Sequence, residues 1–455
     1  MPQWGICLRC LAGHNQKNEQ EYDSIFNNKL REACFMAPKK SNQVTGTIQP
    51  VLKRFAGNPI LRPEATHWWE SKAVFNPAAI YEGGKVHILY RALGDTDTSV
   101  IGYASSRDGF HIDERLDQPV YVPREPFEGV GAIRQAEVEL SDNYTSGGSF
   151  AGGCEDPRLT LIDDRVYMTY VAYDGYSSPR IALSSIDIND FLNKNWKWKK
   201  PVLISRPDIV DKNACILPEK INGKYVIFHR IFPEILIDFV DDLDFDGEGR
   251  WLEGQFKIPI MESASSWDSR KVAAGPPPMR TKDGWLFIYH AIDDKDEFRY
   301  KMGAMLLDIN YPPKVLARTT HPILEPVARY ENEGLKTGVV YPCGAVILKD
   351  QLFVYYGGAD MVVCVATAKM DEFMLQLSDE HEPVQVSVPV NPVNVAVNPV
   401  KTHMKTQEPI YGYCMKCRAK AEIKNPHHVT MKNRRHAVQG ICPRCGTKIF
   451  RFKRG

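Results

Sequence analysis

The sequence lacks any run of apolar residues approaching the roughly 18 to 20 that a membrane-spanning helix needs. Apolar residues make up 43% of the chain and are interleaved with 25% charged residues, as in soluble globular proteins. The start of the chain also lacks the apolar segment of a signal peptide. We therefore expect a cytoplasmic protein with no membrane partner.

Cysteine is scarce for a disulfide-held scaffold, with 11 in 455 residues. Four of these stand singly in strand-like sequence and are typical of small buried hydrophobic residues: Cys154, Cys215, Cys343 and Cys364. We expect neither a disulfide framework nor a catalytic cysteine. Cys7 and Cys10, with His14 and Cys34, leave open a metal site near the N-terminus, but the polar surroundings favour a disordered or irregular extension over residues 1–45.

The other cysteines form two Cys-x-x-Cys pairs, Cys414 with Cys417 and Cys442 with Cys445. Two such pairs typically supply four thiolates to one tetrahedral Zn²⁺ ion. The sequence thus predicts a small zinc ribbon with a structural zinc over residues 409–455. Before it, residues 379–408 are rich in Pro, Val and Asn, which predicts an extended linker.

A net charge of only +1 hides an uneven distribution. Residues 401–455 contain 14 Lys and Arg against 2 acidic residues, a net charge of +12, which leaves −11 for the other 400 residues. A basic module of this kind favours binding to nucleic acid or another polyanion. The alternative is that the charge keeps a small metal module soluble, and both interpretations stay open.

One pattern recurs five times between residues 55 and 375: a polar or proline-bearing start, an apolar strand, a tight turn and an aromatic-rich strand. Four of the copies continue into a third strand, and together the copies cover residues 75–106, 155–185, 212–230, 275–307 and 342–367. Asn-Gly and Asp-Gly between alternating runs indicate hairpins. Repeats of this length made only of strands predict an all-β, five-bladed β-propeller over residues 50–378, with a β-sandwich as the alternative. The first strands should line a central funnel ringed by Asn76, Asp156, Lys212, Gly275 and Pro342.

Asp156 lies in Glu155-Asp-Pro-Arg158 at the start of the second copy. Pro157 has no backbone N–H and should push Asp156 toward an extended conformation, so that this carboxylate is held stiffly beside a guanidinium. Taken alone, the Asp-Pro pair is equally ordinary turn chemistry. Its place at one of five converging strands favours a catalytic role.

Basic residues recur at corresponding positions of the neighbouring copies: Lys212, Arg230, Lys271 and His290, with the amide of Asn213 beside them. Such a cluster suits a phosphate or sulfate. Glycosidases normally need two carboxylates. An enzyme that cleaves with phosphate needs only one, because the anion is itself the nucleophile, so this combination favours phosphorolysis.

Six short fragments carry a resemblance to a known family: Gly57-Asn-Pro-Ile60, Phe75-Asn-Pro-Ala78, Glu155-Asp-Pro-Arg158, Asn213-Ala214, Phe228-His-Arg230 and Tyr289-His290. In this order they resemble glycoside hydrolase family 130, the inverting β-mannoside phosphorylases. The resemblance implies a five-bladed propeller with Asp156 as the general acid. Its proton would reach the glycosidic oxygen through the 3-hydroxyl of mannose, while phosphate attacks C1 to give α-mannose 1-phosphate.

The same resemblance implies the ligands of each subsite. Phosphate would be bound by Lys212, Asn213, Arg230, Lys271 and His290, with Lys212 standing where arginine is common in the family. Mannose would be held by Asn76, Arg91 and Asp360, with Tyr103 and Tyr300 as neighbours. The partners are then a β-mannoside oligosaccharide and inorganic phosphate, with no catalytic cofactor, and a homo-oligomer stays open.

Two other functions remain as alternatives. One is a β-mannosidase on the same scaffold, although family members that hydrolyse lack this basic set. The other is a non-catalytic propeller that binds glycans or proteins, with the ribbon recruiting nucleic acid. The segment 413–451 is also similar to small zinc-ribbon domains of unknown function.

Overall fold

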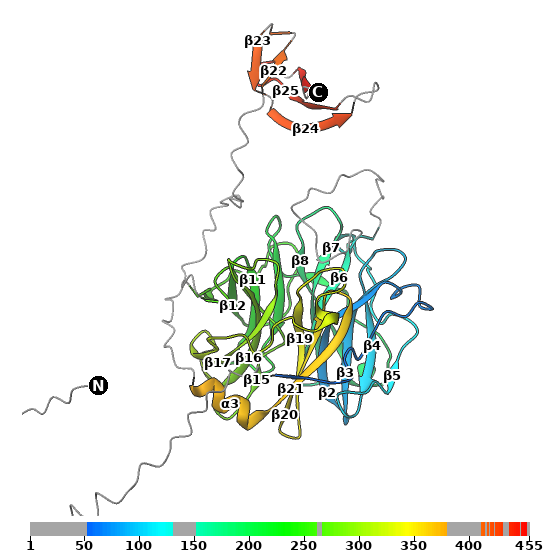
Figure 1. Ribbon diagram of the computed structural model, residues 1–455, viewed down its shortest axis with the longest axis vertical. Coiled ribbons are helices and arrows are strands. Elements are labelled where there is room, and N and C mark those ends of the chain that lie inside the picture. Colours follow the sequence, from blue (N-terminus) through cyan, green and yellow to red (C-terminus); the bar gives the residue numbers. More distant parts are fainter. Residues whose placement is uncertain are drawn as a thin grey trace, which may run out of the picture. The chain divides into compact units, whose positions relative to one another are not determined.

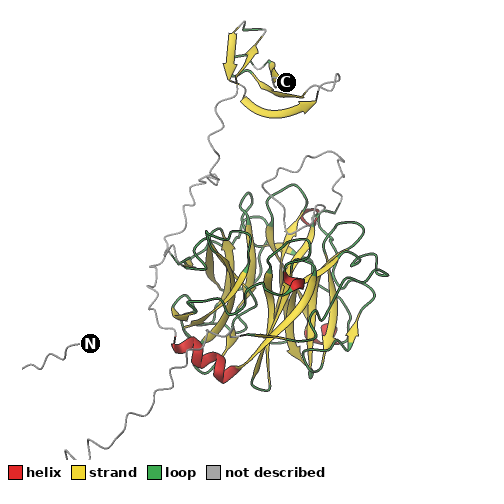
Figure 2. Ribbon diagram, viewed as in Figure 1, coloured by secondary structure: helices red, strands yellow, loops and turns green. Residues whose placement is uncertain are grey.

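The computed structural model describes residues 52–130, 152–261, 266–379 and most of 411–452. The predicted N-terminal extension lies outside these residues, as does the predicted linker beyond residue 379. Nearly all of the described chain is strand or turn (Figure 2), in agreement with the all-β prediction. None of the described helices is long and apolar enough to cross a bilayer.

Five antiparallel sheets form the five blades of a propeller (Figure 1), as the five sequence repeats predict. The first blade comprises β2 (Ala73–Glu82), β3 (Lys85–Leu93), β4 (Val100–Ser106) and β5 (Glu114–Arg115). The second comprises β6 (Gly153–Ile162), β7 (Arg165–Tyr173), β8 (Arg180–Asp187) and β9 (Val202–Leu203). The third comprises β10 (Asp211–Ile216), β11 (Tyr225–Ile231), β12 (Glu234–Val240) and β13 (Phe256–Ile258).

The fourth blade comprises β14 (Lys271–Ala274), β15 (Met279–Arg280), β16 (Trp285–Ile292), β17 (Lys301–Leu307) and β18 (Val315–Arg318). The fifth comprises β19 (Val340–Leu348), β20 (Gln351–Gly358), β21 (Val362–Lys369) and β1 (Lys53–Arg54). The first strands of neighbouring blades contact one another, β19 with β2, β2 with β6, β6 with β10 and β10 with β14. They therefore surround the centre of the ring.

The ring is closed by a strand from the opposite end of the propeller. In β1, Lys53 pairs with Thr367 and Arg54 with Ala366 of β21. Blade five thus takes its outermost strand from the segment that precedes blade one. This pairing joins the beginning of the propeller chain to its last blade.

Two hairpin turns share a left-handed conformation, which the Asn-Gly sequence favours and the Lys-Asp sequence does not. Asn222 and Gly223 have φ values of 51° and 80°, as a type I′ turn requires, and Lys349 and Asp350 have 47° and 62°. Between the blades, strand side chains bury large aromatic residues such as Tyr103 and Tyr170 in one cluster, and Phe228 and Tyr289 in another. The blades are held together by this apolar packing.

Four short helices complete the described propeller: η1 (Pro126–Glu128), α2 (Ile188–Leu192), η2 (Arg329–Glu331) and α3 (Met370–Asp379). In α3 the side chains of Phe373 and Leu377 are buried, spaced one turn apart.

The C-terminal part contains two small antiparallel sheets. A two-stranded sheet pairs β22 (Tyr411–Cys414) with β23 (Ala419–Glu422). A three-stranded sheet comprises β24 (Lys424–Thr430), β25 (His436–Ile441) and β26 (Lys448–Phe452).

Candidate active site

Four inner strands shift register against their neighbours, and in three of them a left-handed Asn or Asp lies at the shift. The pairing of β2 with β3, of β6 with β7 and of β10 with β11 shifts register at one point, and the residues there are Asn76, Asp156 and Asn213. Their φ values are 49°, 51° and 60°, a left-handed conformation that Asn and Asp tolerate better than most residues. Bulges of this kind turn a side chain away from the ordinary strand direction.

The expectation that Pro157 holds Asp156 in an extended conformation is therefore wrong. Asp156 has a φ of 51° because it is the bulged residue, and a following proline disfavours only the right-handed helical region. Asp156 is nevertheless fixed, since the repeated bulge determines its direction. The bulge leaves only 7% of Asp156 exposed to solvent.

One pocket brings together ten of the eleven residues predicted for catalysis, phosphate and sugar. It is lined by Asn76, Arg91, Glu155, Asp156, Lys212, Asn213, Arg230, Lys271, His290, Tyr300, Lys336, Val339, Tyr341 and Asp360. Residues from all five blades thus line one site.

Gly275 and Pro342, expected to ring the funnel, are not among the lining residues. Gly275 serves the packing instead, because a Cβ atom there would lie 2.8 Å from the backbone oxygen of Ile288 and 3.1 Å from Pro342. Tyr341, beside Pro342, is the residue through which the start of blade five lines the pocket.

Tyr103 is the one predicted substrate neighbour that does not line the pocket. Its hydroxyl lies 2.8 Å from His87 Nδ1, and its ring packs against Phe191 and Trp196 in the core. The prediction of a substrate contact for Tyr103 is thus corrected to a packing role, because this position of β4 faces the interior between blades.

One half of the pocket, the acid half, consists of Asn76, Arg91, Glu155 and Asp156. Asp156 Oδ1 accepts hydrogen bonds from Asn76 Nδ2 at 2.8 Å and Arg91 Nη1 at 3.2 Å. The other terminal nitrogen of Arg91 donates to Glu155 Oε1 at 2.9 Å, so one buried guanidinium holds both carboxylates. Glu155 Oε2 also lies 3.9 Å from Lys212 Nζ, so two cations lie beside the two carboxylates without any ligand.

Arg158 supports Asp156 from behind. Its guanidinium donates to the backbone oxygens of Asp156, Gly275 and Ala274 at 2.8, 3.1 and 3.3 Å, which fastens the bulge of β6 to β14. Burial raises the pKa of Asp156, but the charges of Arg91 and Arg158 outweigh burial and lower the pKa below its ordinary value. Asp156 is therefore ionised in the ligand-free site.

The other half, the cationic half, consists of Lys212, Asn213, Arg230, Lys271 and His290. Arg230 Nε donates to Asn213 Oδ1 at 2.9 Å, and the Asn213 amide donates to the hydroxyl of Tyr341. Lys271 Nζ donates to the Tyr300 hydroxyl at 2.9 Å. Among the described residues, neither Arg230 nor Lys271 lies within 4.0 Å of a carboxylate oxygen.

Burial and mutual repulsion between positive charges lower the pKa values of two groups in this half, Lys271 and His290. Burial and the charge of Arg230 together lower the pKa of Lys271 to about 8, against the opposing effect of Tyr300. Burial together with Lys271 keeps the pKa of His290 well below its ordinary value, so the imidazole is neutral. His290 Nδ1 is buried without a hydrogen-bond partner in the described part of the chain. The arrangement is what an anionic ligand with several acceptor oxygens would complete.

Lys336 and Tyr341 were missed as lining residues by the reading of the sequence. Lys336 lies in a loop before β19, outside the repeated strand pattern, so its chemistry has no periodic signal. Glu155 also lines the pocket and is linked to Asp156 through Arg91, which bonds both carboxylates.

Comparison with known proteins agrees with this geometry. The family described as beta-1,4-mannooligosaccharide phosphorylase, glycoside hydrolase family 130, matches residues 50–379. The chain belongs to this family. Residues 413–452 match a separate domain of unknown function, which leaves the predicted polyanion binding of the ribbon untested.

Two curated members of family 130 illustrate its range. The chain is 40% identical over 340 residues to the 1,2-beta-oligomannan phosphorylase of Thermoanaerobacter sp. (strain X514), covering 70% of this chain and 98% of the relative. It is 28% identical over 336 residues to the beta-1,4-mannooligosaccharide phosphorylase of Ruminococcus albus, covering 71% and 89%.

Among solved structures of the family, the beta-1,2-mannobiose phosphorylase from Listeria innocua in complex with beta-1,2-mannobiose superposes with a TM-score of 0.55 at 27% identity. The match covers 72% of this chain and 99% of that protein. The family 130 scaffold is thus present over its whole length.

Proposed function

We propose that this family 130 protein cleaves β-mannosides with inorganic phosphate and releases α-mannose 1-phosphate with inversion. The observation that supports the proposal best is the cationic half of the pocket, in which Arg230 and Lys271 have no carboxylate partner among the described residues. A phosphate dianion would supply the missing negative charge and accept hydrogen bonds from Lys212, Asn213, Arg230, Lys271 and His290.

In the proposed reaction a phosphate oxygen forms a bond to C1 of mannose as the bond from C1 to the glycosidic oxygen breaks. The leaving oxygen takes a proton from Asp156, passed through the 3-hydroxyl of the sugar. Asp156 must therefore be protonated in the complex, although it is ionised in the empty pocket. A bound dianion raises its pKa, and a bound sugar removes the remaining water, which favours the neutral acid.

Asn76, Arg91, Asp360 and Tyr300 are proposed to hold the mannose. Burial and the charge of Asp156 together raise the pKa of Asp360 to about 6, against the opposing charge of Lys336. A carboxyl group that is protonated for part of the time can both donate and accept hydrogen bonds to sugar hydroxyls.

We propose β-1,2-linked mannooligosaccharides as the substrates, because the relative at 40% identity is named for that linkage and the relative named for β-1,4 linkages is at 28%. The test is to incubate β-1,2- and β-1,4-mannobiose with and without phosphate and to measure free mannose and mannose 1-phosphate. Phosphate-dependent formation of mannose 1-phosphate from the β-1,2 disaccharide is expected. Equal release of free mannose in both conditions would identify the β-mannosidase alternative instead.

The proposed Zn²⁺ site of the ribbon fits the described cysteines. Cys417, Cys442 and Cys445 place their sulfur atoms within 4.8 Å of one another, and the first two are 3.9 Å apart. Four thiolates bound tetrahedrally at about 2.3 Å have sulfurs about 3.8 Å apart. We propose Cys414 as the fourth ligand. Metal analysis should give one zinc per chain, and Cys442→Ser should lose it.

The cytoplasm remains the proposed location. The reaction consumes inorganic phosphate and releases a charged sugar phosphate, which a cell retains inside its membrane.

A further inference from the structure

The loop between η2 and β19 brings a further lysine, Lys336, into the pocket. Lys336 Nζ lies 4.1 Å from the centroid of the Tyr300 ring. Lys271 Nζ lies 4.1 Å from the same centroid and donates to the Tyr300 hydroxyl at 2.9 Å. Two ammonium groups from different segments of the chain thus converge on one phenol.

The charges around Tyr300 are balanced only in part by the described chain. Burial raises the pKa of Tyr300, but the charges of Lys271 and Lys336 outweigh burial and lower the pKa to about 7, so the phenol offsets part of their positive charge. Lys336 has no carboxylate within 4.0 Å in the described part of the chain. Like charges gathered in a buried site repel one another unless an anion lies between them. Because Lys271 already belongs to the cationic half, Lys336 extends that half toward blade five.

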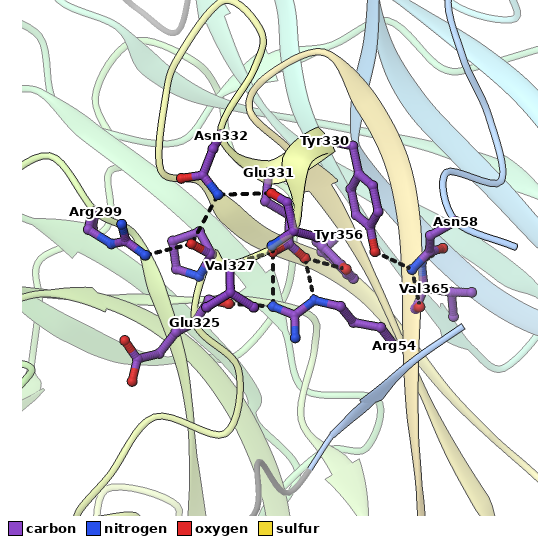
Figure 3. Close-up of polar contacts among 12 residues, drawn as sticks. Arg54, Asn58, Arg299, Glu325, Val327, Tyr330, Glu331, Asn332, Tyr356 and Val365 are labelled. Atoms are coloured by element: carbon purple, nitrogen blue, oxygen red, sulfur yellow. Dashed lines mark hydrogen bonds and ion pairs between the residues drawn. The ribbon is translucent and has the colours of Figure 1, made fainter. Parts of the chain in front are cut away.

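A buried carboxylate, Glu331, lies at the start of the loop that contains Lys336, and Figure 3 shows its polar contacts. Glu331 is fully buried and accepts hydrogen bonds from Arg54 Nε at 2.8 Å and Nη2 at 2.9 Å. It also accepts from the Tyr356 hydroxyl at 2.8 Å and from the backbone N–H groups of Val327 and Ala328 at 2.9 Å each. Five donors therefore fix one side chain.

Backbone hydrogen bonds connect Glu331 to the rest of the loop that contains Lys336. The backbone oxygen of Glu331 accepts hydrogen bonds from the backbone N–H groups of Gly338 and Val339 at 3.1 and 2.9 Å, and these two bonds close the loop. The N–H of Lys336 donates to the oxygen of Ala359 at 3.0 Å, and the N–H of Tyr300 donates to the oxygen of Gly338 at 2.9 Å. The loop is therefore bonded on both sides of Lys336 and to Tyr300 itself.

We propose that Lys336 is a further phosphate ligand of this pocket and that Glu331, held by Arg54, is its positioning residue. This inference rests on the proposed phosphorolytic function and adds to it a ligand from blade five. Since Arg54 lies on β1, the strand that closes the ring also sets the affinity for phosphate.

The first test compares the wild-type full-length protein with Lys336→Met, Lys336→Arg and the control Glu333→Gln. Glu333 lies on the same loop, is exposed and pairs only with Arg329 among the described residues. Binding of inorganic phosphate is measured by calorimetry, and KM is measured for phosphate and for β-1,2-mannobiose. Lys336→Met should weaken phosphate binding about 10- to 100-fold, the loss of one charged hydrogen bond, with the disaccharide KM within about threefold.

Lys336→Arg, which keeps the charge, should stay within about fivefold of the wild type, and Glu333→Gln should bind phosphate normally. Wild-type phosphate affinity in Lys336→Met would overturn the role of Lys336. If instead the wild type releases free mannose equally with and without phosphate, the proposed function itself fails, and the two failures are thereby distinguished.

The second test examines the positioning role of Glu331 by removing the guanidinium that holds it, in Arg54→Gln. Lys53→Gln, on the same strand, is the control. Arg54→Gln should lower the melting temperature and raise the phosphate KM about five- to tenfold, with kcat at saturating phosphate within about threefold. Lys53→Gln should change neither quantity. A lower melting temperature with an unchanged phosphate KM would show a purely structural role and overturn this part of the proposal.

Discussion

The two halves of the pocket differ in how their charges are compensated. In the acid half, Arg91 bonds Glu155 and Asp156, and Lys212 lies 3.9 Å from Glu155, so the carboxylates are paired with cations before any ligand arrives. In the cationic half, Arg230 and Lys271 bond only neutral oxygens of the described chain. The difference indicates that the acid half is organised in advance, whereas the cationic half is completed by its ligand.

The acid half is tested by Asp156→Asn. Loss of the proton donor should lower kcat by about 10²- to 10⁴-fold, the usual contribution of general acid catalysis. Asn has nearly the same volume and can still accept the bonds from Asn76 and Arg91, so the melting temperature should change little. An activated aryl β-mannoside, whose leaving group needs no proton, should recover much of the rate. Normal turnover of mannobiose by this variant would remove Asp156 from the mechanism.

Behind the cationic half, on the far face of β11, the charges are paired. His229 is fully buried, with Nδ1 2.8 Å from Asp211 and Nε2 2.9 Å from Asp238. His229→Gln removes the central charge and should destabilise the fold by about 3 kcal/mol, measured by denaturant unfolding. A decrease of less than about 0.5 kcal/mol in the free energy of unfolding would show that the triad makes no net contribution to stability.

The triad also predicts how stability depends on pH. Burial lowers the pKa of His229, but Asp211 and Asp238 outweigh burial and raise the pKa to about 10. Since the folded value is above the ordinary 6.5, the stabilisation is fully present below pH 6.5 and is lost as pH rises toward 10. The wild type should therefore lose stability over this window, and His229→Gln should lose much less.

The cationic half is tested directly by Arg230→Lys, with the exposed Arg280→Lys as control. Lysine keeps the charge but cannot bond Asn213 and an anion together as the guanidinium fork can. The phosphate KM should rise about tenfold, while the disaccharide KM changes less than about threefold. Equal increases in both KM values would indicate a distorted pocket rather than a lost phosphate contact.

The smallest expected effect is the pH dependence of phosphate binding. Because the pKa of Lys271 is lowered to about 8, this lysine loses its charge as pH rises from 7.5 to 9. The phosphate KM should rise several-fold over this range, and the disaccharide KM should stay nearly constant. In Lys271→Met the phosphate KM should be high throughout and depend less on pH.

The fold was predictable because the blades repeat. Each copy carries its own hairpin turn, such as Asn222-Gly223, and its own inner strand, so five local patterns predict one ring. The same periodicity placed Asp156, Lys212 and His290 in one pocket. It did not reveal the bulges, because a register shift depends on pairing with the neighbouring strand and not on the alternation of residues.

Lys336 and Tyr103 show where sequence reasoning ends. Lys336 is placed by backbone bonds to Glu331 and Ala359, which no local pattern encodes. Tyr103 has the chemistry of a sugar neighbour, but its direction is set by packing against Phe191 and Trp196.

The pairing of β1 with β21 has a consequence for how the chain reaches its folded state. Arg54 and Ala366 are 312 residues apart along the chain. Bringing the ends of such a loop together costs on the order of 5 kcal/mol of entropy if the intervening chain is still unfolded, and much less once four blades have formed. During synthesis, β1 emerges early and has no partner until blade five appears. We therefore expect β1, the first strand of the propeller to be synthesised, to be among the last to pair.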